Sequence, residues 1–211
     1  QGQPLTPERL VELSAVLDDQ GPRKLIDAIT RDAAYARARA IDAYLGVLCR
    51  VPSGRELSAA IARVGSEPSG TKLRAELLGS DEYFERYAGE DLAVFARQLY
   101  GQAFGRVPDE AEVADLRARL RRRVSRAAVA LDMLTGAEAR ATQVRAIYQH
   151  YLARDADVKT LIAEIGRQEN FLGFGILADT LGTQSFDPET GCEDLHQASL
   201  AAAPDEFHQR D

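Results

Sequence analysis

Three segments of the chain share one pattern, an aromatic residue followed by a short helical stretch and an arginine. They read YLGVLCR from Tyr44 to Arg50, YGQAFGR from Tyr100 to Arg106 and YQHYLAR from Tyr148 to Arg154. The arginines are 56 and then 48 residues apart. These spacings are near the period of helical repeat proteins, in which each unit packs on its neighbours. The recurrence predicts a scaffold assembled from similar units.

The segment before the first of these patterns fits as half a unit. Residues 4–44 align without a gap with residues 108–148 and pair Leu25 with Val129 and Ile29 with Met133. We therefore predict an all-α protein of about a dozen short helices, stacked as three and a half imperfect repeats. The repeat domain is expected to span residues 4–186 and to be followed by an acidic tail at 187–211.

Helix starts are marked by capping residues. Ser53 with Glu56 and Asp109 with Glu112 have the spacing of a capping box, and Thr6 precedes a proline. Each repeated arginine is expected to follow a helix end, where its cation meets free carbonyl groups. The repeated tyrosines (Tyr44, Tyr100, Tyr148) are expected to fill the space between units.

The two cysteines allow two interpretations. Cys49 lies in an apolar helical stretch and Cys192 in the polar tail. They are either two unrelated thiols or a disulfide that ties the tail to the repeat domain, and the disulfide requires an oxidising compartment.

Charge and hydropathy narrow the classes of partner. The net charge of −7 argues against general nucleic-acid binding. No apolar run in the sequence approaches the length of a membrane span. We expect no membrane span, and a partner that is another protein or a surface polymer.

Although the net charge of the chain is negative, six arginines are clustered in one stretch of the sequence. This cluster has two interpretations, a site for an anionic partner or a solvated helix face of alternating charge. Because no aromatic residues are interleaved with these arginines, the pattern favours the solvated face. The cluster consists of Arg117, Arg119, Arg121, Arg122, Arg123 and Arg126.

No pattern in the chain has the composition of a catalytic or metal site. Asp155 and Asp157 lack the glycine and the distal glutamate of a calcium loop. His150 lies between tyrosines and has no carboxylate or cysteine at helical reach to form a dyad. We expect no catalytic residue, no metal and no cofactor.

Several motifs resemble a known family. The sequence LLGSDEYF at 77–84 is followed by FARQLY at 95–100, GRVPD at 105–109 and SRAAV at 125–129. This order resembles a bacterial repeat family of unassigned function that occurs in secreted and surface proteins. That family is similar to the linker domains of cyanobacterial phycobilisomes. The chain departs from the pattern near its end, where the S-x-E-Y motif is replaced by LGTQS at 181–185.

The resemblance implies that the protein is bacterial and is secreted or located on the cell surface. The residues themselves leave a cytoplasmic localisation open. We expect a non-enzymatic structural or protein-interaction scaffold. The alternative is a carbohydrate- or small-ligand-binding module that uses a Tyr/Arg groove between repeats. An exposed groove would favour the alternative, and tyrosines buried between units would favour the scaffold.

Overall fold

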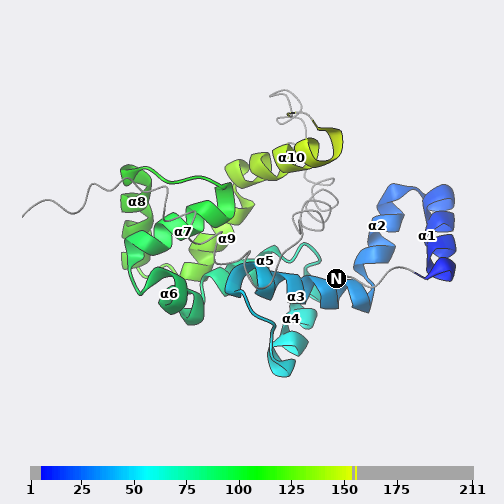
Figure 1. The fold of residues 1–211 in the computed structure, drawn as a ribbon, viewed down its shortest axis with the longest axis horizontal. Coiled ribbons are helices and arrows are strands. Elements are labelled where there is room, and N and C mark those ends of the chain that lie inside the picture. The colour runs from blue at the N-terminus through cyan, green and yellow to red at the C-terminus, as the bar shows by residue number, and fades with distance from the viewer. Residues whose placement is uncertain (1–5, 154, 156–211) are drawn as a thin grey trace, which may run out of the picture.

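The structure, a computed structural model, describes residues 6–153 and 155. These residues form helices and connecting turns without a strand, which confirms the all-α prediction (Figure 1). The stacking in three and a half repeats stays a prediction. The helices of the described part are α1 (Pro7–Gln20), α2 (Pro22–Thr30), α3 (Ala33–Leu48), α4 (Gly54–Ser66), α5 (Thr71–Leu78), α6 (Asp81–Ala88), α7 (Leu92–Phe104), α8 (Glu110–Arg121), α9 (Arg126–Thr135) and α10 (Ala137–Leu152).

The predicted capping residues begin their helices. Ser53 and Glu56 form a capping box at the start of α4, and Asp109 and Glu112 form another at the start of α8. The Thr6 hydroxyl accepts a hydrogen bond from the backbone N–H of Arg9 in α1. These contacts satisfy N–H groups that the first helical turn leaves without a backbone partner.

Helix lengths explain the uneven spacing of the arginines. Helices α3 and α10 each contain 16 residues and end at Leu48 and Leu152, two positions before the arginine of the aromatic–arginine pattern. In the middle of the chain the corresponding stretch runs from Asp81 to Phe104 and is divided into α6 and α7. Gly89 and Glu90, both with positive φ, separate the two helices, and Asp91 caps the second. The extra residues lengthen the first spacing from 48 to 56.

The centre of the molecule is the contact between α5 and α9. A Cβ on Gly79 would lie 2.2 Å from the backbone nitrogen of Ala127, so only glycine permits this approach. Helices α3, α4 and α7 pack around the pair. The largest fully buried side chains are those of Tyr83, Phe95, Leu48, Leu78, Leu99, Gln98, Val47, Val64, Val129 and Val144.

The α1–α2 hairpin is less well packed than its counterpart in the sequence alignment. Helix α2 lies beside α1 and contacts α1 and α3 (Figure 1). It has no buried residue. Val129 and Met133 of α9 are buried, whereas Leu25 and Ile29, aligned with them, are half-buried. The alignment predicts the helix boundaries here, but among the described residues no helix packs on the hairpin in the way that α5 packs on α9.

Several predictions concern residues outside the described part. They are the domain boundary between 186 and 187, the acidic tail, Arg154, Asp157 and Cys192. Within the described part, none of the helices combines the length and the apolar character needed to cross a bilayer.

Candidate functional site: two arginine joints and a basic corner

The first arginine joint consists of Tyr44, Arg50, Glu56 and Glu82. The Arg50 guanidinium donates to both carboxylates, at 2.7 and 3.0 Å from the oxygens of Glu56 and at 2.6 Å from each oxygen of Glu82. The guanidinium carbon lies 5.4 Å from the centroid of the Tyr44 ring. One arginine therefore ties the end of α3 to the starts of α4 and α6.

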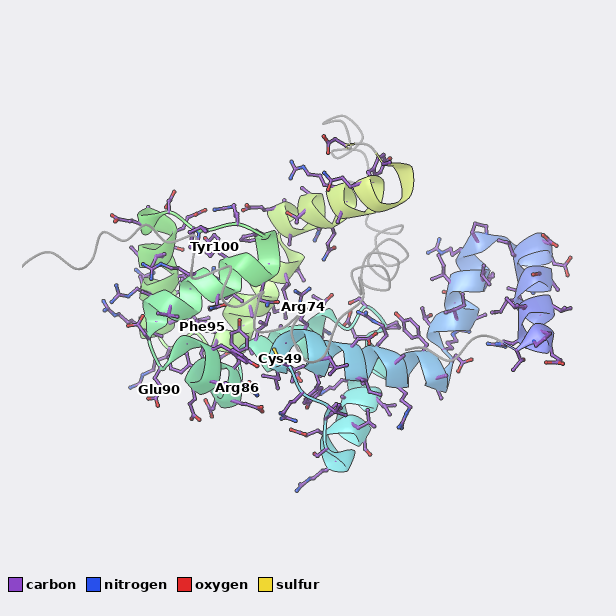
Figure 2. All side chains as sticks on the ribbon, in the orientation of Figure 1. Cys49, Arg74, Arg86, Glu90, Phe95 and Tyr100 are labelled. Carbon is purple, nitrogen blue, oxygen red and sulfur yellow. The ribbon has the colours of Figure 1, made fainter. Side chains whose placement is uncertain are left out.

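The second arginine joint repeats this arrangement with Tyr100, Arg106, Glu112 and Glu138. Arg106 donates to Glu112 at 2.6 and 2.8 Å and to Glu138 at 2.5 and 3.1 Å. Its guanidinium carbon lies 5.1 Å from the centroid of the Tyr100 ring. Each residue lies 56 positions after its counterpart in the first joint. Figure 2 marks Tyr100 on α7 and Cys49 at the end of α3.

A left-handed backbone residue places each arginine. The helices that precede the joints end at Cys49 with φ 53° and at Gly105 with φ 66°. This conformation stops the helix and turns the next residue toward the start of the following helix. Ala153 has the same conformation, with φ 48°, at the end of α10. Tyr148 is half-buried on that helix, and the predicted third arginine, Arg154, lies outside the described residues.

Charge pairing perturbs the pKa values of the joint residues. Hydrogen bonds from Arg50, with those from Ser53, lower the pKa of Glu56 from 4.5 to about 2. Arg106 and the Asp109 backbone lower the pKa of Glu112 from 4.5 to about 2. Hydrogen bonds to Glu82 and Glu56 raise the pKa of Arg50, and hydrogen bonds to Glu112 and Glu138 raise the pKa of Arg106. All these groups are therefore held in their charged forms at neutral pH.

Arg50 and Arg106 lie after helix ends, as expected, but backbone carbonyl groups are not their main partners. Both arginines bind carboxylates, and among the described residues the backbone carbonyls that they contact are those of Val51 and Val107, at 3.3 and 3.4 Å. Two carboxylates attract a guanidinium more strongly than partial charges on carbonyl groups do. The sequence held the missing signal, because a glutamate follows each arginine by 6 and by 32 residues.

The basic cluster divides into bound and exposed arginines. Arg119 pairs with Asp132 at 2.7 Å. Arg126 donates to the Gly79 carbonyl at 3.2 Å and also binds the Asp81 carboxylate. The Nε of Arg117 is buried, and its charge contributes to the low pKa of Asp91, which is caused mainly by backbone hydrogen bonds from Val94 and Ala93. In the part of the chain that the structure describes, three members of the cluster are exposed and form no ion pair: Arg121, Arg122 and Arg123.

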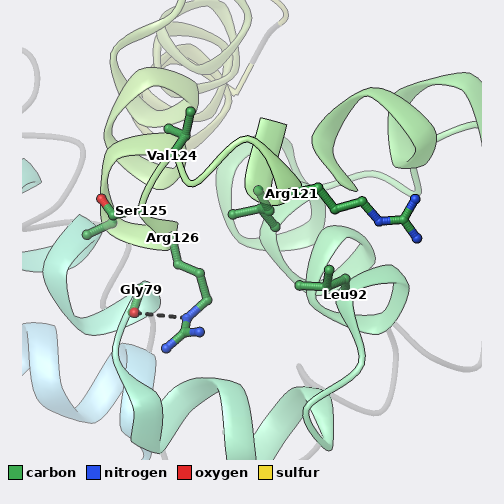
Figure 3. A pocket seen from close by; sticks show the side chains of 8 residues that line it. Gly79, Leu92, Arg121, Val124, Ser125 and Arg126 are labelled. Carbon is green, nitrogen blue, oxygen red and sulfur yellow. Dashed lines mark hydrogen bonds between the residues drawn. The ribbon is translucent and has the colours of Figure 1, made fainter. Parts of the chain in front are cut away.

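These three arginines and the half-exposed Val124 form what we call the basic corner, at the turn between α8 and α9. The corner adjoins a cavity of about 360 Å³. The Arg126–Gly79 hydrogen bond closes one side of the cavity, and Figure 3 shows Arg121 directed away from Arg126. The cavity is lined by Gly79, Leu92, Leu120, Arg121, Val124, Ser125, Arg126 and Ala127.

The remaining predictions concern the cysteines and the possible metal and catalytic residues. Cys49 is disulfide-bonded. The interpretation of two unrelated free thiols is therefore wrong for Cys49. Cys192, the partner in the other interpretation, lies outside the described residues, so that pairing stays a hypothesis. Asp155 accepts a hydrogen bond from Gln149 at 2.8 Å. Among the described residues no three His, Cys, Asp or Glu side chains are grouped to hold a metal ion, and the His150 side chain lies outside that part.

Comparison with known proteins gives one match. Residues 75–143 match a family described as a domain of unknown function, DUF4214. The matched stretch runs from α5 into α10 and contains all four residues of the second arginine joint. No curated protein and no solved structure matches the chain.

Proposed function

We propose that this protein is a non-enzymatic scaffold that binds other proteins in a bacterial envelope or extracellular assembly. The observation that supports the proposal most is that both Tyr/Arg pairs are engaged in contacts within the chain. Each arginine is held between two carboxylates and a tyrosine ring of its own chain. Side chains bound in this way fix the angles between helices, which is the task of a scaffold.

The same observation argues against the ligand-binding alternative. A saccharide site needs an aromatic face and hydrogen-bond donors that are open to the ligand. Tyr44 is 8% exposed, Tyr100 is half-buried, and the donors of both arginines already face carboxylates. A ligand would have to replace these internal bonds.

Two observations support the proposed extracellular or envelope localisation. One is the resemblance of the repeat motifs to a family found in secreted and surface proteins and, through it, to phycobilisome linkers. The other is the disulfide at Cys49, since disulfides persist in oxidising compartments. The DUF4214 match gives no information on localisation, because it is described only as a domain of unknown function.

The test offers the purified full chain two classes of ligand. We expect saturable binding of an envelope protein from the source bacterium and no binding of soluble envelope polysaccharides, measured by capture and by calorimetry. Tyr100→Phe keeps the ring and removes the hydroxyl, so it should leave protein binding unchanged. Saturable polysaccharide binding that Tyr100→Phe weakens would favour the alternative and overturn the proposal.

A further inference from the structure

We propose that the protein assembles head to tail with copies of itself, through an acidic, partly apolar face on α1 and the basic corner between α8 and α9. This inference rests on the proposed scaffold function and names a partner for it, a second copy of the chain. It combines two exposed surfaces that the arginine joints leave unused.

The first surface lies on α1. Leu10, Val11 and Leu17 are 51%, 71% and 42% exposed, and they are three of the six large apolar side chains that are exposed in the described part of the chain. Asp18 and Asp19 follow directly, are exposed, and form no ion pair within the described residues. At 3.6 residues per turn these five residues extend around about half of α1, from Leu10 and Leu17 past Val11 and Asp18 to Asp19. We call this surface the acidic face. Apolar area beside unpaired charge is typical of a contact surface.

The second surface is the basic corner. Arg121, Arg122 and Arg123 are exposed and unpaired within the described part, and Val124 is 39% exposed beside the cavity. The partly buried Leu92 and Leu120 line the same cavity. The corner therefore offers positive charge next to an apolar hollow, the complement of carboxylates next to exposed aliphatic side chains.

The two surfaces occupy corresponding positions in similar helix pairs. Helices α2 and α9 begin at Pro22 and Arg126, which are 104 residues apart. With this spacing Asp18 corresponds to Arg122 and Asp19 to Arg123. The same corner of the fold thus carries opposite charge in the two places. Opposite charges on two surfaces favour encounter and fix orientation.

Their placement determines the kind of assembly. In Figure 1, α1 lies at one end of the long axis and α8 at the other. The acidic face is thus too distant to cover the basic corner of its own chain. Contact between unlike surfaces of two copies is heterologous, and it extends into open chains or closes into rings.

The experiment measures the mass of the full chain in solution by sedimentation velocity and light scattering over a wide range of concentration. We expect species above the monomer mass of 23.1 kDa that grow with concentration. In Arg122→Glu/Arg123→Glu, and separately in Asp18→Lys/Asp19→Lys, the dissociation constant should rise at least about tenfold, equivalent to about 1.4 kcal/mol. An equimolar mixture of the two variants should assemble again, because each reversed surface meets a complementary one.

A matched control separates this contact from a general charge effect. Arg37→Glu/Arg55→Glu changes the net charge equally at exposed arginines without an ion pair in the described part, and it should assemble like the wild type. Circular dichroism checks that every variant is folded.

Three outcomes overturn the inference: a wild type that stays monomeric, corner variants that assemble normally, or a mixture that fails to assemble. If the wild type is monomeric but still binds an envelope protein, the inference fails while the proposed scaffold function stands.

Discussion

The two arginine joints share their contacting residues and differ at the residue that ends the preceding helix. Arg50 and Arg106 make the same bonds to glutamates at the same spacing. The helix before Arg50 ends at Cys49, and the helix before Arg106 ends at Gly105. The comparison teaches that the joint depends on charge geometry, whereas its cap needs only to reach the left-handed conformation.

The caps do not reach that conformation equally well. Glycine adopts a positive φ without strain, whereas a residue with a Cβ loses about 1–2 kcal/mol there. Cys49 is the strained cap, and it is also the residue held by a disulfide. The residue that precedes the first joint thus has a less favourable backbone conformation than glycine would have, and it is also disulfide-bonded.

The largest difference between the joints should appear on reduction. If Cys49 is bonded to Cys192, as one of the two interpretations of the sequence has it, reduction should lower the free energy of unfolding by about 4–5 kcal/mol in the simple chain-entropy model. The second joint has no cysteine. Urea unfolding with and without reductant measures the change, and peptide mapping under non-reducing conditions identifies the partner. Two free thiols in protein prepared without reductant would contradict the prediction.

Removing either arginine should have the next largest effect. Arg50→Ala and Arg106→Ala each leave two carboxylates without their common partner, so each should lower the free energy of unfolding by about 1–2 kcal/mol. Similar losses are expected because the arginines are 30% and 37% exposed. Denaturant unfolding provides the measurement, with Arg55→Ala as a control at an exposed arginine. A loss confined to one variant would show that the joints are not equivalent.

The cap of the second joint can be tested by comparing two glycine substitutions. Gly105→Ala introduces a Cβ at φ 66° and should destabilise the protein by about 1 kcal/mol. Gly46→Ala, inside α3 and with nothing within 4 Å of its new Cβ, should be neutral or stabilising. Thermal unfolding of both variants distinguishes a strained cap from a helical glycine. Equal effects would mean that Gly105 is not needed for its conformation.

Acid should weaken both joints, with the smallest effect per joint. The folded-state pKa values of Glu56 and Glu112 are about 2, below their usual 4.5. A lowered pKa adds stability that is present above pH 4.5 and is lost as the pH falls toward 2. Because these side chains are partly exposed, the loss should be below about 1 kcal/mol per joint. Glu56→Gln and Glu112→Gln should each flatten the dependence of unfolding free energy on pH, and an unchanged slope would contradict this.

The sequence contains local signals for most of the fold. Capping residues such as Ser53 and Asp109 act within one helical turn, so their role follows from spacing alone. The positions of Arg50 and Arg106 after helix ends follow in the same way. Their partners do not, because Glu82 and Glu138 lie 32 residues away and reach the arginines only once the helices pack.

Packing also separates residues that look alike in the sequence. The six clustered arginines have similar flanks, yet Arg126 is bound to Gly79 and stacks on Phe84, while Arg122 is exposed. Leu25 and Val129 align, but within the described residues Val129 is buried under α5, whereas Leu25 is half-buried between helices that leave it partly exposed. Burial depends on which helix lies opposite, and a single repeat unit does not contain that information.

The break between α6 and α7 lies between the residues of two joints. Glu82 belongs to the first joint and lies before the break, whereas Tyr100 belongs to the second and lies after it. Residues can therefore be added or removed around Gly89 without changing any contact in either joint. The distance and the angle between successive joints become adjustable quantities, and proteins of different length and curvature can be built from one unchanged connector.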